Sequence, residues 1–293
     1  MFQDYLFFAV DKPVFYSFRM LHASHLVQEA QRLHQLNSQR ALLLSDALVS
    51  GLLLSSLLDY NEQVNLRFHC GEHFTIGCEA TFEGNIRGYI ECAEDSPVVK
   101  QIDVGDFEKE EILVRSVRTQ KNKPQLAEGV TASVTNRLEE ALNEHLTSSY
   151  QMNTYVRFKS FIDPQTQTLR AFGIVFQELP GIPEEVSKEL HQHILNLPPL
   201  EDLYNQNDDP DVLATKLLPH ELKPVRSLNP KFFCPCTIER VAEALATFPK
   251  SDLEDMVAKN ESPVIKCHYC SRQHVIDTSR VKNILLALDT KYN

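Results

Sequence analysis

Glycine is scarce in this chain, and several motifs that depend on it are missing. Only nine of the 293 residues are glycine, so a loop that cradles phosphate has few places to form, and neither common type of that loop occurs. The Gly-x-Ser-x-Gly elbow and the His-Glu-x-x-His helix are missing as well. The sequence therefore gives no sign of a nucleotide-binding enzyme, of a hydrolase with that elbow or of a zinc protease.

Basic residues are also in short supply, with 29 Lys and Arg against 40 Asp and Glu and a net charge of −11. A chain with this charge is poorly suited to follow a phosphate backbone or to bind an anionic membrane. We therefore predict neither a nucleic acid nor a membrane as a partner. One long apolar stretch, residues 41–60, is interrupted by Asp46 and four serines, and we expect it to be a central core helix instead of a membrane span.

The first ten residues, MFQDYLFFAV, lack a basic segment, and Asp4 precedes the apolar run. We read no secretory signal in them and expect a cytoplasmic protein in a reducing compartment. There, clustered cysteines usually indicate metal or redox chemistry. Of the seven cysteines, Cys70, Cys78 and Cys92 lie in the first third, and we expect them to be small buried side chains.

Hydrophobic periodicity predicts an α+β fold in three parts. The first, residues 1–178, is an N-terminal core domain of strands and helices. Its expected strands are two within 5–20, then 64–70, 74–82, 85–91, 154–162 and 169–178, and its expected helices are 24–36, with Ser24 as the cap, 41–60 and about 134–148.

The second part, residues 179–230, is predicted to be a metastable helical linker. Eight of the fifteen prolines lie within 180–230, and short helices fit between them at 184–195 and 210–218. This composition indicates a connector that wraps a neighbour, although an ordinary helical subdomain remains an alternative.

The third part, residues 231–293, is a small helical domain that would need a staple beyond its own core. We expect a helix with Ile238, Val241, Leu245 and Phe248 facing inward, a second that starts with a capping box of Ser251 and Glu254, and a third over 281–289.

Four cysteines supply a possible staple. Cys234-x-Cys236 and Cys267-x-x-Cys270 are separated by 30 residues, a pattern that suits a tetrahedral site for one Zn²⁺ per chain. His268 and His274 flank the second pair and are expected on the surface.

The same thiols can also be oxidised. A one-residue gap lets neighbouring cysteines bond to each other, so the site can hold zinc or disulfides but not both. Loss of zinc would unfold the small domain and expose apolar surface that binds partly unfolded proteins. Two alternatives remain open: a thiol-disulfide oxidoreductase that uses Cys267 and Cys270, and a zinc-ribbon protein that binds nucleic acid.

The segments FFCPCTIERVAEAL, SDLEDMV and IKCHYC, together with EGNIRGYIE and RAFGIVFQELPGIPEE, resemble the redox-regulated heat-shock chaperone family known as the 33 kDa chaperonin. The resemblance implies a non-enzymatic, ATP-independent holdase of the stress response. It implies an inactive form that is reduced and zinc-bound, and an active form with an unfolded linker and with Cys234–Cys236 and Cys267–Cys270 disulfides. It further implies unfolded proteins as clients, a homodimer when oxidised, and hand-off of clients to ATP-driven foldases. The chain departs from the family's Ser-Glu-Gln-x-Pro turn at 149–153, which reads SYQMN.

Overall fold

The structure, a computed structural model, describes residues 3–92, 109–120, 123–204 and 210–291. It combines sheets with helices, as the α+β prediction requires. Contacts divide the chain into two compact units, Met1–Phe233 and Cys234–Asn293. The predicted linker, residues 179–230, is grouped with the first unit, and the three-part division made from the sequence stays a prediction.

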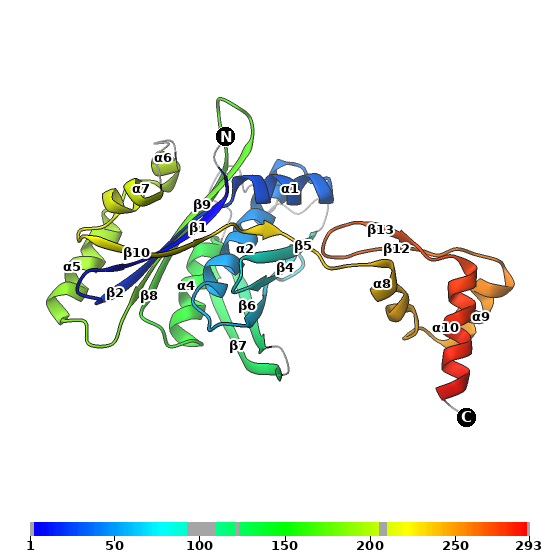
Figure 1. The fold of residues 1–293 in the computed structure, drawn as a ribbon. Coiled ribbons are helices and arrows are strands. Elements are labelled where there is room, and N and C mark those ends of the chain that lie inside the picture. The colour runs from blue at the N-terminus through cyan, green and yellow to red at the C-terminus, as the bar shows by residue number, and fades with distance from the viewer. Residues whose placement is uncertain (1–2, 93–108, 121–122, 205–209, 292–293) are drawn as a thin grey trace. The chain divides into compact units, whose positions relative to one another are not determined.

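Two sheets form the frame of the first unit (Figure 1). The five-stranded sheet has the order β10-β1-β2-β9-β8, and the six-stranded sheet has the order β11-β5-β4-β3-β6-β7. Neighbouring strands are antiparallel except β11 and β5, which are parallel. Their bounds are β1 Tyr5–Asp11, β2 Tyr16–His22, β3 Glu62–Cys70, β4 Phe74–Thr81, β5 Asn85–Cys92, β6 Glu110–Gln120, β7 Lys123–Thr135, β8 Thr154–Ile162, β9 Leu169–Glu178, β10 Leu222–Leu228 and β11 Lys231–Phe232.

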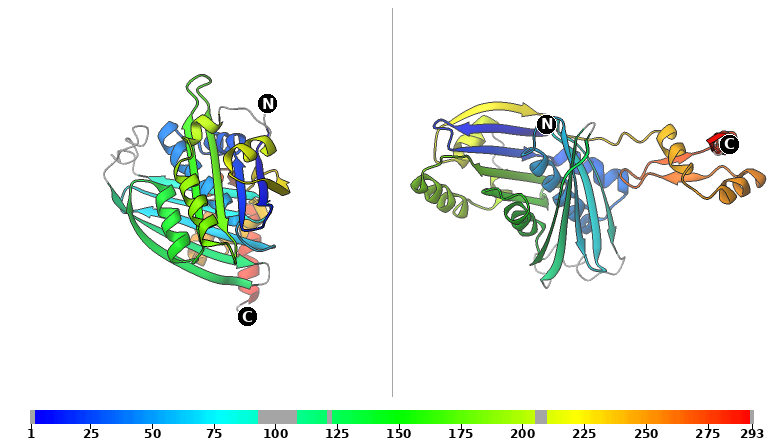
Figure 2. Two further views of the ribbon diagram at one scale, coloured as in Figure 1. Left: turned by 90° about the vertical axis from the view of Figure 1, so that its left-hand side faces the viewer. Right: turned by 90° about the horizontal axis from the view of Figure 1, so that it is seen from below.

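Helices α1 (Ser24–His34), α2 (Ser38–Ser55) and α4 (Leu138–Ser148) lie between the two sheets (Figure 2). The central one is α2, which contacts strands of both sheets. A Cβ atom at Gly51 would come within 2.6 Å of the Cys78 sulfur, so this helix needs glycine to approach β4. The position of α2 between the two sheets explains why it is apolar on nearly every side. Among the described residues, no helix is long and apolar enough to cross a membrane.

The five-stranded sheet has a hydrophobic core on each of its two faces. Successive residues along a strand point to opposite faces, so neighbouring residues belong to different cores. On β1, Leu6 and Phe8 join the core around α2, whereas Phe7 and Ala9 join a second core on the other face. The sheet residues of this second core are Phe7, Ala9, Tyr16, Phe18, Met20, Phe172, Ile174 and Phe176. Two separate cores therefore share one sheet.

The connector covers the second core. It contains α5 (Glu184–Leu195), α6 (Leu200–Tyr204), α7 (Pro210–Leu217) and the edge strand β10, which pairs with β1. Its buried side chains in this core are Leu190, Ile194, Leu200, Leu203, Leu213, Ala214, Leu217 and Leu218. The connector thus packs against the sheet through leucines instead of forming a core of its own.

Two expectations for the first unit were wrong. The helix predicted over 134–148 begins at Leu138, because 123–135 form β7; Val134, assigned to the helix, is an exposed strand residue. Ser24 does not cap α1. The cap is the buried carboxylate of Asp4, which accepts hydrogen bonds from the backbone N–H of His25 at 3.0 Å and of Leu26 at 2.7 Å.

The second unit contains α8 (Ile238–Leu245), α9 (Lys250–Ala258), the hairpin β12 (Val264–Lys266) with β13 (Gln273–Val275), and α10 (Thr278–Lys291). Among its described residues, the buried apolar core consists of Val241, Ala242, Leu245, Leu253, Ile276 and Val281, with partly buried apolar side chains packed against it. The inward positions of Val241 and Leu245 are confirmed.

Two details of this unit differ from expectation. Phe248 lies beyond the last turn of α8 and is 45% exposed. The capping box does not form, because α9 begins at Lys250 after Pro249, and the Ser251 hydroxyl donates to the Asp252 carboxylate instead.

Candidate metal and redox centre

Two short segments of the second unit carry the four cysteines. Cys234 and Cys236 lie in the extended segment before α8. Thr237 caps this helix, because its side chain accepts a hydrogen bond from the Arg240 N–H. The other pair lies at the tip of the β12–β13 hairpin.

This hairpin tip is a tight turn closed by two backbone hydrogen bonds of 2.8 Å. The N–H of Cys267 donates to the carbonyl of Arg272, and the N–H of Ser271 donates to the carbonyl of Cys267. Ser271 adopts a left-handed conformation with φ of 56°, which directs the chain back toward β13 directly after Cys270.

The four sulfur atoms converge. The Cys234 and Cys267 sulfurs are 3.7 Å apart, the Cys236 and Cys270 sulfurs are 3.3 Å apart, and all four lie within 4.8 Å of one another. Four sulfurs bound tetrahedrally to one zinc ion at about 2.3 Å would be separated by about 3.8 Å. The predicted ligands are therefore brought together at a spacing that fits a zinc ion.

The electrostatics of the cluster also fit a cation. Burial and hydrogen bonds from the neighbouring thiols raise the pKa of Cys236, and burial raises the pKa of Cys270. Thiolates packed this closely repel each other, and a divalent cation supplies the charge that compensates them. Four close cysteines can hold a metal ion, and a soft all-sulfur donor set is one that zinc accepts.

The two flanking histidines differ from each other. His268 is exposed as expected. His274 is buried, contrary to the surface prediction, because it lies on β13 opposite Ile265 of β12. Among the described residues, the group of cysteines, histidines and acids that converges on a possible metal site consists of the four cysteines, without either histidine.

The other three cysteines are separate from this centre. All seven are free thiols. Cys70 and Cys78 are buried as expected, and Cys92 is half-buried. Burial raises the pKa of Cys70 to about 11 and that of Cys78 to about 12, and it also raises the pKa of Cys92. Such thiols form little thiolate and are poor targets for oxidants.

Sequence reasoning missed how the connector is anchored. Tyr204, at the end of α6, stacks on His22 of β2, and Tyr5 also stacks on that histidine. The guanidinium of Arg170 lies 5.5 Å from the centre of the Tyr204 ring. In the sequence, Tyr204 is visible only as a single tyrosine within a segment rich in proline and acidic residues. The sequence pattern of that segment does not identify the rings that the tyrosine contacts.

Comparisons with known proteins point to a single family. The family model described as Hsp33 protein matches residues 4–277. A 33 kDa chaperonin from Lactobacillus johnsonii is 27% identical over 288 residues, which cover 97% of this chain and 98% of the relative. A 33 kDa chaperonin from Aquifex aeolicus is 25% identical over 289 residues, which cover 96% of this chain and 89% of the relative.

A solved structure supports the same fold. The crystal structure of the 33 kDa chaperonin (heat shock protein 33 homolog) from Thermotoga maritima matches with a TM-score of 0.83 and 20% identity, covering 98% of this chain and 100% of that chain. The fold and these matches define a chaperone family. The chain belongs to the Hsp33 protein family, and the family resemblance read from its cysteine segments is confirmed.

Proposed function

We propose that the protein is a redox-regulated, ATP-independent holdase whose switch is the four-cysteine centre. The observation that carries the proposal is the convergence of Cys234, Cys236, Cys267 and Cys270 to within 4.8 Å of one another. In the reduced state these four sulfurs bind one Zn²⁺ per chain. The metal, when bound, ties the segment before α8 to the β12–β13 hairpin.

Oxidation removes the ligands. Two disulfides form, Cys234–Cys236 and Cys267–Cys270, and each pair of sulfurs gives up two electrons. With peroxide as the oxidant, those two electrons and two protons from solvent reduce one molecule of peroxide to two molecules of water for each disulfide formed, and the zinc ion would be released. Because all four sulfurs are close, proximity alone does not select this pairing over others; the pairing rests on the family resemblance.

Loss of the metal would unfold the second unit. Among the described residues, six buried side chains form its core, with partly buried apolar side chains packed against them. Structural zinc in small domains supplies about 10–16 kcal/mol of apparent folding free energy. Without that contribution a core of this size is marginal.

The connector would then detach from the sheet, because its chain continues directly into Cys234 of the unfolded unit. Its release would expose the sheet face that carries Phe7, Tyr16, Phe18, Phe172 and Phe176, all of which are buried in the closed form. A contiguous aromatic face of this kind binds apolar segments of other chains. We therefore propose unfolded or partly unfolded proteins as its clients.

The remaining partners and the location of the protein belong to the same proposal. We propose a homodimer in the oxidised state and transfer of clients to ATP-driven foldases in the cytoplasm, without a nucleic acid or a membrane as a partner. These assignments are supported by membership of the family and by the acidic net charge.

The alternative, a thiol-disulfide oxidoreductase that uses Cys267 and Cys270, is supported less well. Both cysteines lie at a hairpin tip and not at the start of a helix, the position that lowers a thiol pKa in enzymes of that type. Burial instead raises the pKa of Cys270. We therefore propose that the protein is not an enzyme.

The test follows zinc, thiols and aggregation in the same sample. Peroxide with mild heat should release one zinc per chain, consume four thiols and suppress aggregation of an unrelated unfolding protein. The oxidised, zinc-free chain leaving that aggregation unchanged would contradict the proposal. Sustained turnover in an insulin-reduction assay would favour the enzyme.

A further inference from the structure

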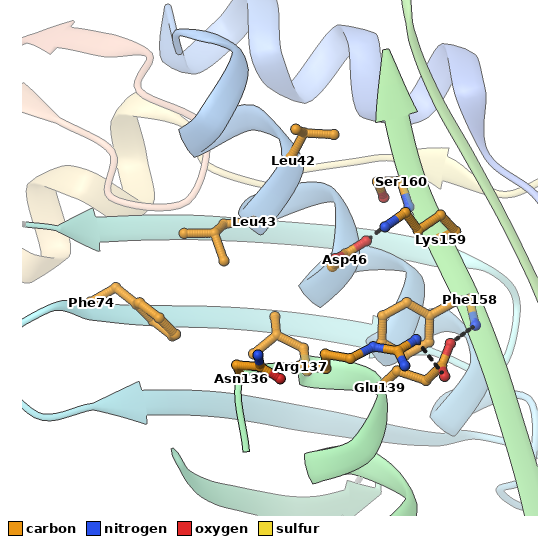
Figure 3. Close-up of a pocket in the computed structure, with 11 residues that line it drawn as sticks. Leu42, Leu43, Asp46, Phe74, Asn136, Arg137, Glu139, Phe158, Lys159 and Ser160 are labelled. Atoms are coloured by element: carbon orange, nitrogen blue, oxygen red, sulfur yellow. Dashed lines mark hydrogen bonds and ion pairs between the residues drawn. The ribbon is translucent and has the colours of Figure 1, made fainter. Parts of the chain in front are cut away.

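A small pocket in the first unit lies far along the sequence from the cysteines and has no part in the switch. It lies between α2, the start of α4, strand β8 and Phe74 of β4, and its volume is about 110 Å³ (Figure 3). A water molecule occupies about 30 Å³ in the liquid, so the pocket has room for a ligand of a few heavy atoms.

The walls are mixed, and polar groups supply the larger part of the lining surface. The apolar side chains are Leu42, Leu43, Phe74, Leu138 and Phe158. Such a lining suits a ligand that has both a short apolar stem and a polar end.

Two carboxylates from different elements lie at one end. Asp46 of α2 accepts a hydrogen bond of 3.0 Å from the backbone N–H of Ser160. Glu139, in the first turn of α4, accepts one of 2.8 Å from the N–H of Phe158 and pairs with Arg137 at 3.0 Å. Burial raises the pKa of Asp46 to about 7 and also raises that of Glu139.

The Ser160 hydroxyl also borders this pocket. Ser160 is 5% exposed, and its hydroxyl lies against the Asp46 carboxylate, whose pKa it lowers. That contact falls short of good hydrogen-bond geometry, so the oxygen keeps the capacity to accept a hydrogen bond from a ligand in the pocket.

We propose that this pocket binds the end of an unbranched aliphatic chain that carries a primary ammonium group. The methylenes would pack against Leu42, Leu43 and Phe74, and the ammonium would donate to the Asp46 carboxylate and to the Ser160 hydroxyl. An ammonium has three donors and no acceptor, which matches an end of the pocket that offers oxygen acceptors.

The charges around the pocket favour a cation over an anion. Arg137 is already engaged by Glu139 and Glu140, and Lys159 has an exposed side chain on β8. Lys159 lowers the pKa of Asp46, but its side chain is exposed and water screens its charge, so a cation inside the pocket would compensate the buried Asp46 carboxylate further. An anionic ligand would be repelled by both acids. Such a ligand could be a free alkylamine or the side chain of a lysine in another polypeptide.

Binding should depend on pH. An alkylammonium keeps its proton up to about pH 10, whereas Asp46 ionises as the pH rises through about 7. The other charged groups that face this end are Glu139, Arg137 and Lys159. Affinity for the ammonium should therefore be several-fold higher at pH 8 than at pH 6.

The first experiment titrates n-butylammonium chloride into the reduced full chain labelled at its leucine methyl groups, with Leu42 and Leu43 assigned by replacement with isoleucine. We expect saturable shifts of these two methyl signals. n-Butanol and sodium butyrate have a chain of the same length without the positive charge and should cause much smaller shifts. Equal shifts with either control, or no saturable shift with n-butylammonium, would overturn the proposal.

Variants identify the groups that bind. Asp46→Asn should weaken binding at least tenfold, while its side-chain oxygen can still accept the Ser160 N–H and so preserve the fold. Ser160→Ala should weaken it about threefold, and Glu111→Gln, which changes an exposed acid on β6, should leave it unaltered. Unchanged affinity in Asp46→Asn would refute the site.

A final comparison separates the two sources of the ammonium group. A short peptide with one lysine is compared with the same peptide acetylated at that lysine. If the unmodified peptide shifts the two methyl signals and the acetylated one does not, the ligand is a lysine side chain. If n-butylammonium binds and neither peptide does, the ligand is a free amine. None of these measurements uses a chaperone assay, so the result is independent of the proposed switch.

Discussion

The ring of Tyr204 stacks on the ring of His22, with 5.1 Å between the centroids and 13° between the planes. The two residues are far apart in sequence, one at the end of α6 in the connector and the other at the end of β2. Phe161 meets the same tyrosine edge-on at 5.4 Å. This aromatic contact holds the connector to the five-stranded sheet next to the leucines of the second core.

Replacing Tyr204 with alanine should therefore release the connector without any oxidation. Loss of a packed aromatic side chain costs about 2–4 kcal/mol, which is large for a segment of short helices. We expect the reduced, zinc-loaded Tyr204→Ala chain to suppress aggregation of an unfolding client where the unaltered chain does not. The control is Leu195→Ala, at a connector position that is 76% exposed. A variant that stays silent until it is oxidised would show that the stacking does not hold the switch closed.

Replacing Cys270 with alanine should remove the metal and unfold the second unit. Cys270 is the most buried of the four proposed ligands, at 2% exposed, and three remaining sulfurs would leave a tetrahedral site incomplete. We expect less than a tenth of the zinc content and loss of helical circular dichroism, with chaperone activity in the reduced state. Cys92→Ala removes a half-buried thiol elsewhere and should retain one zinc per chain. Full zinc content in Cys270→Ala would exclude this cysteine as a ligand.

Replacing Ser271 with glycine should strengthen the centre. Its φ of 56° costs a residue with a Cβ atom about 1 kcal/mol, a strain that glycine does not have. We expect the second unit to gain about that much stability and to lose zinc to a chelator about fivefold more slowly. Asn260→Gly, at a φ of 54°, is the matched control, because asparagine tolerates this conformation and should gain little. Faster zinc loss in Ser271→Gly would show that the serine side chain contributes more than its backbone strain costs.

His145 should make the first unit sensitive to acid. It is fully buried between the hydroxyls of Ser116 and Thr131, at 2.8 and 2.9 Å, and burial lowers its pKa to about 4. The unfolded chain takes up a proton at this histidine near pH 6.5 and the folded chain does not, so stability falls as the pH drops from 6.5 toward 4, by roughly 3 kcal/mol in total. Above pH 6.5 the residue adds no pH dependence.

The measurement is the free energy of unfolding of the full chain and of His145→Gln at pH 7 and pH 5. The difference between the two chains isolates His145 from the other titrating groups. We expect the variant to be the less stable chain at pH 7 and to lose less stability on acidification. Parallel losses in the two chains would show that His145 does not respond to acid in this way.

Regular alternation and spacing were enough to predict much of the fold and the candidate centre. The strands 154–162 and 169–178 agree with β8 and β9 to the residue, because each alternates between two faces and is bounded by a clear turn. The apolar run 41–60 predicts a core helix, and α2, Ser38–Ser55, is one, although it begins and ends earlier. The spacing of Cys234, Cys236, Cys267 and Cys270 named the cluster that the structure brings together.

What could not be predicted depends on partners distant in sequence. The cap of α1 comes from Asp4 of another segment, and a local rule assigned it to Ser24. Strand β10 exists because it pairs with β1, and its own sequence, LKPVRSL, contains a proline that argues against a strand. The pocket needs Asp46 and Ser160, which lie 114 residues apart. In the sequence Asp46 is visible only as an interruption of an apolar helix.

The alternation along β1 places neighbouring residues in two different cores, one on each face of the sheet. Leu6 and Phe8 belong to the core around α2, and Phe7 and Ala9 belong to the core under the connector. The strands therefore stay packed against the first core when the connector leaves the second. The domain can therefore lose its connector as a cooperative block of its own, at a temperature well below the one that melts the helices between the sheets. Hydrogen exchange of the full chain would resolve this as a hierarchy, with the amides of α5 and α7 opening at low free energy and those of α2 opening only on global unfolding.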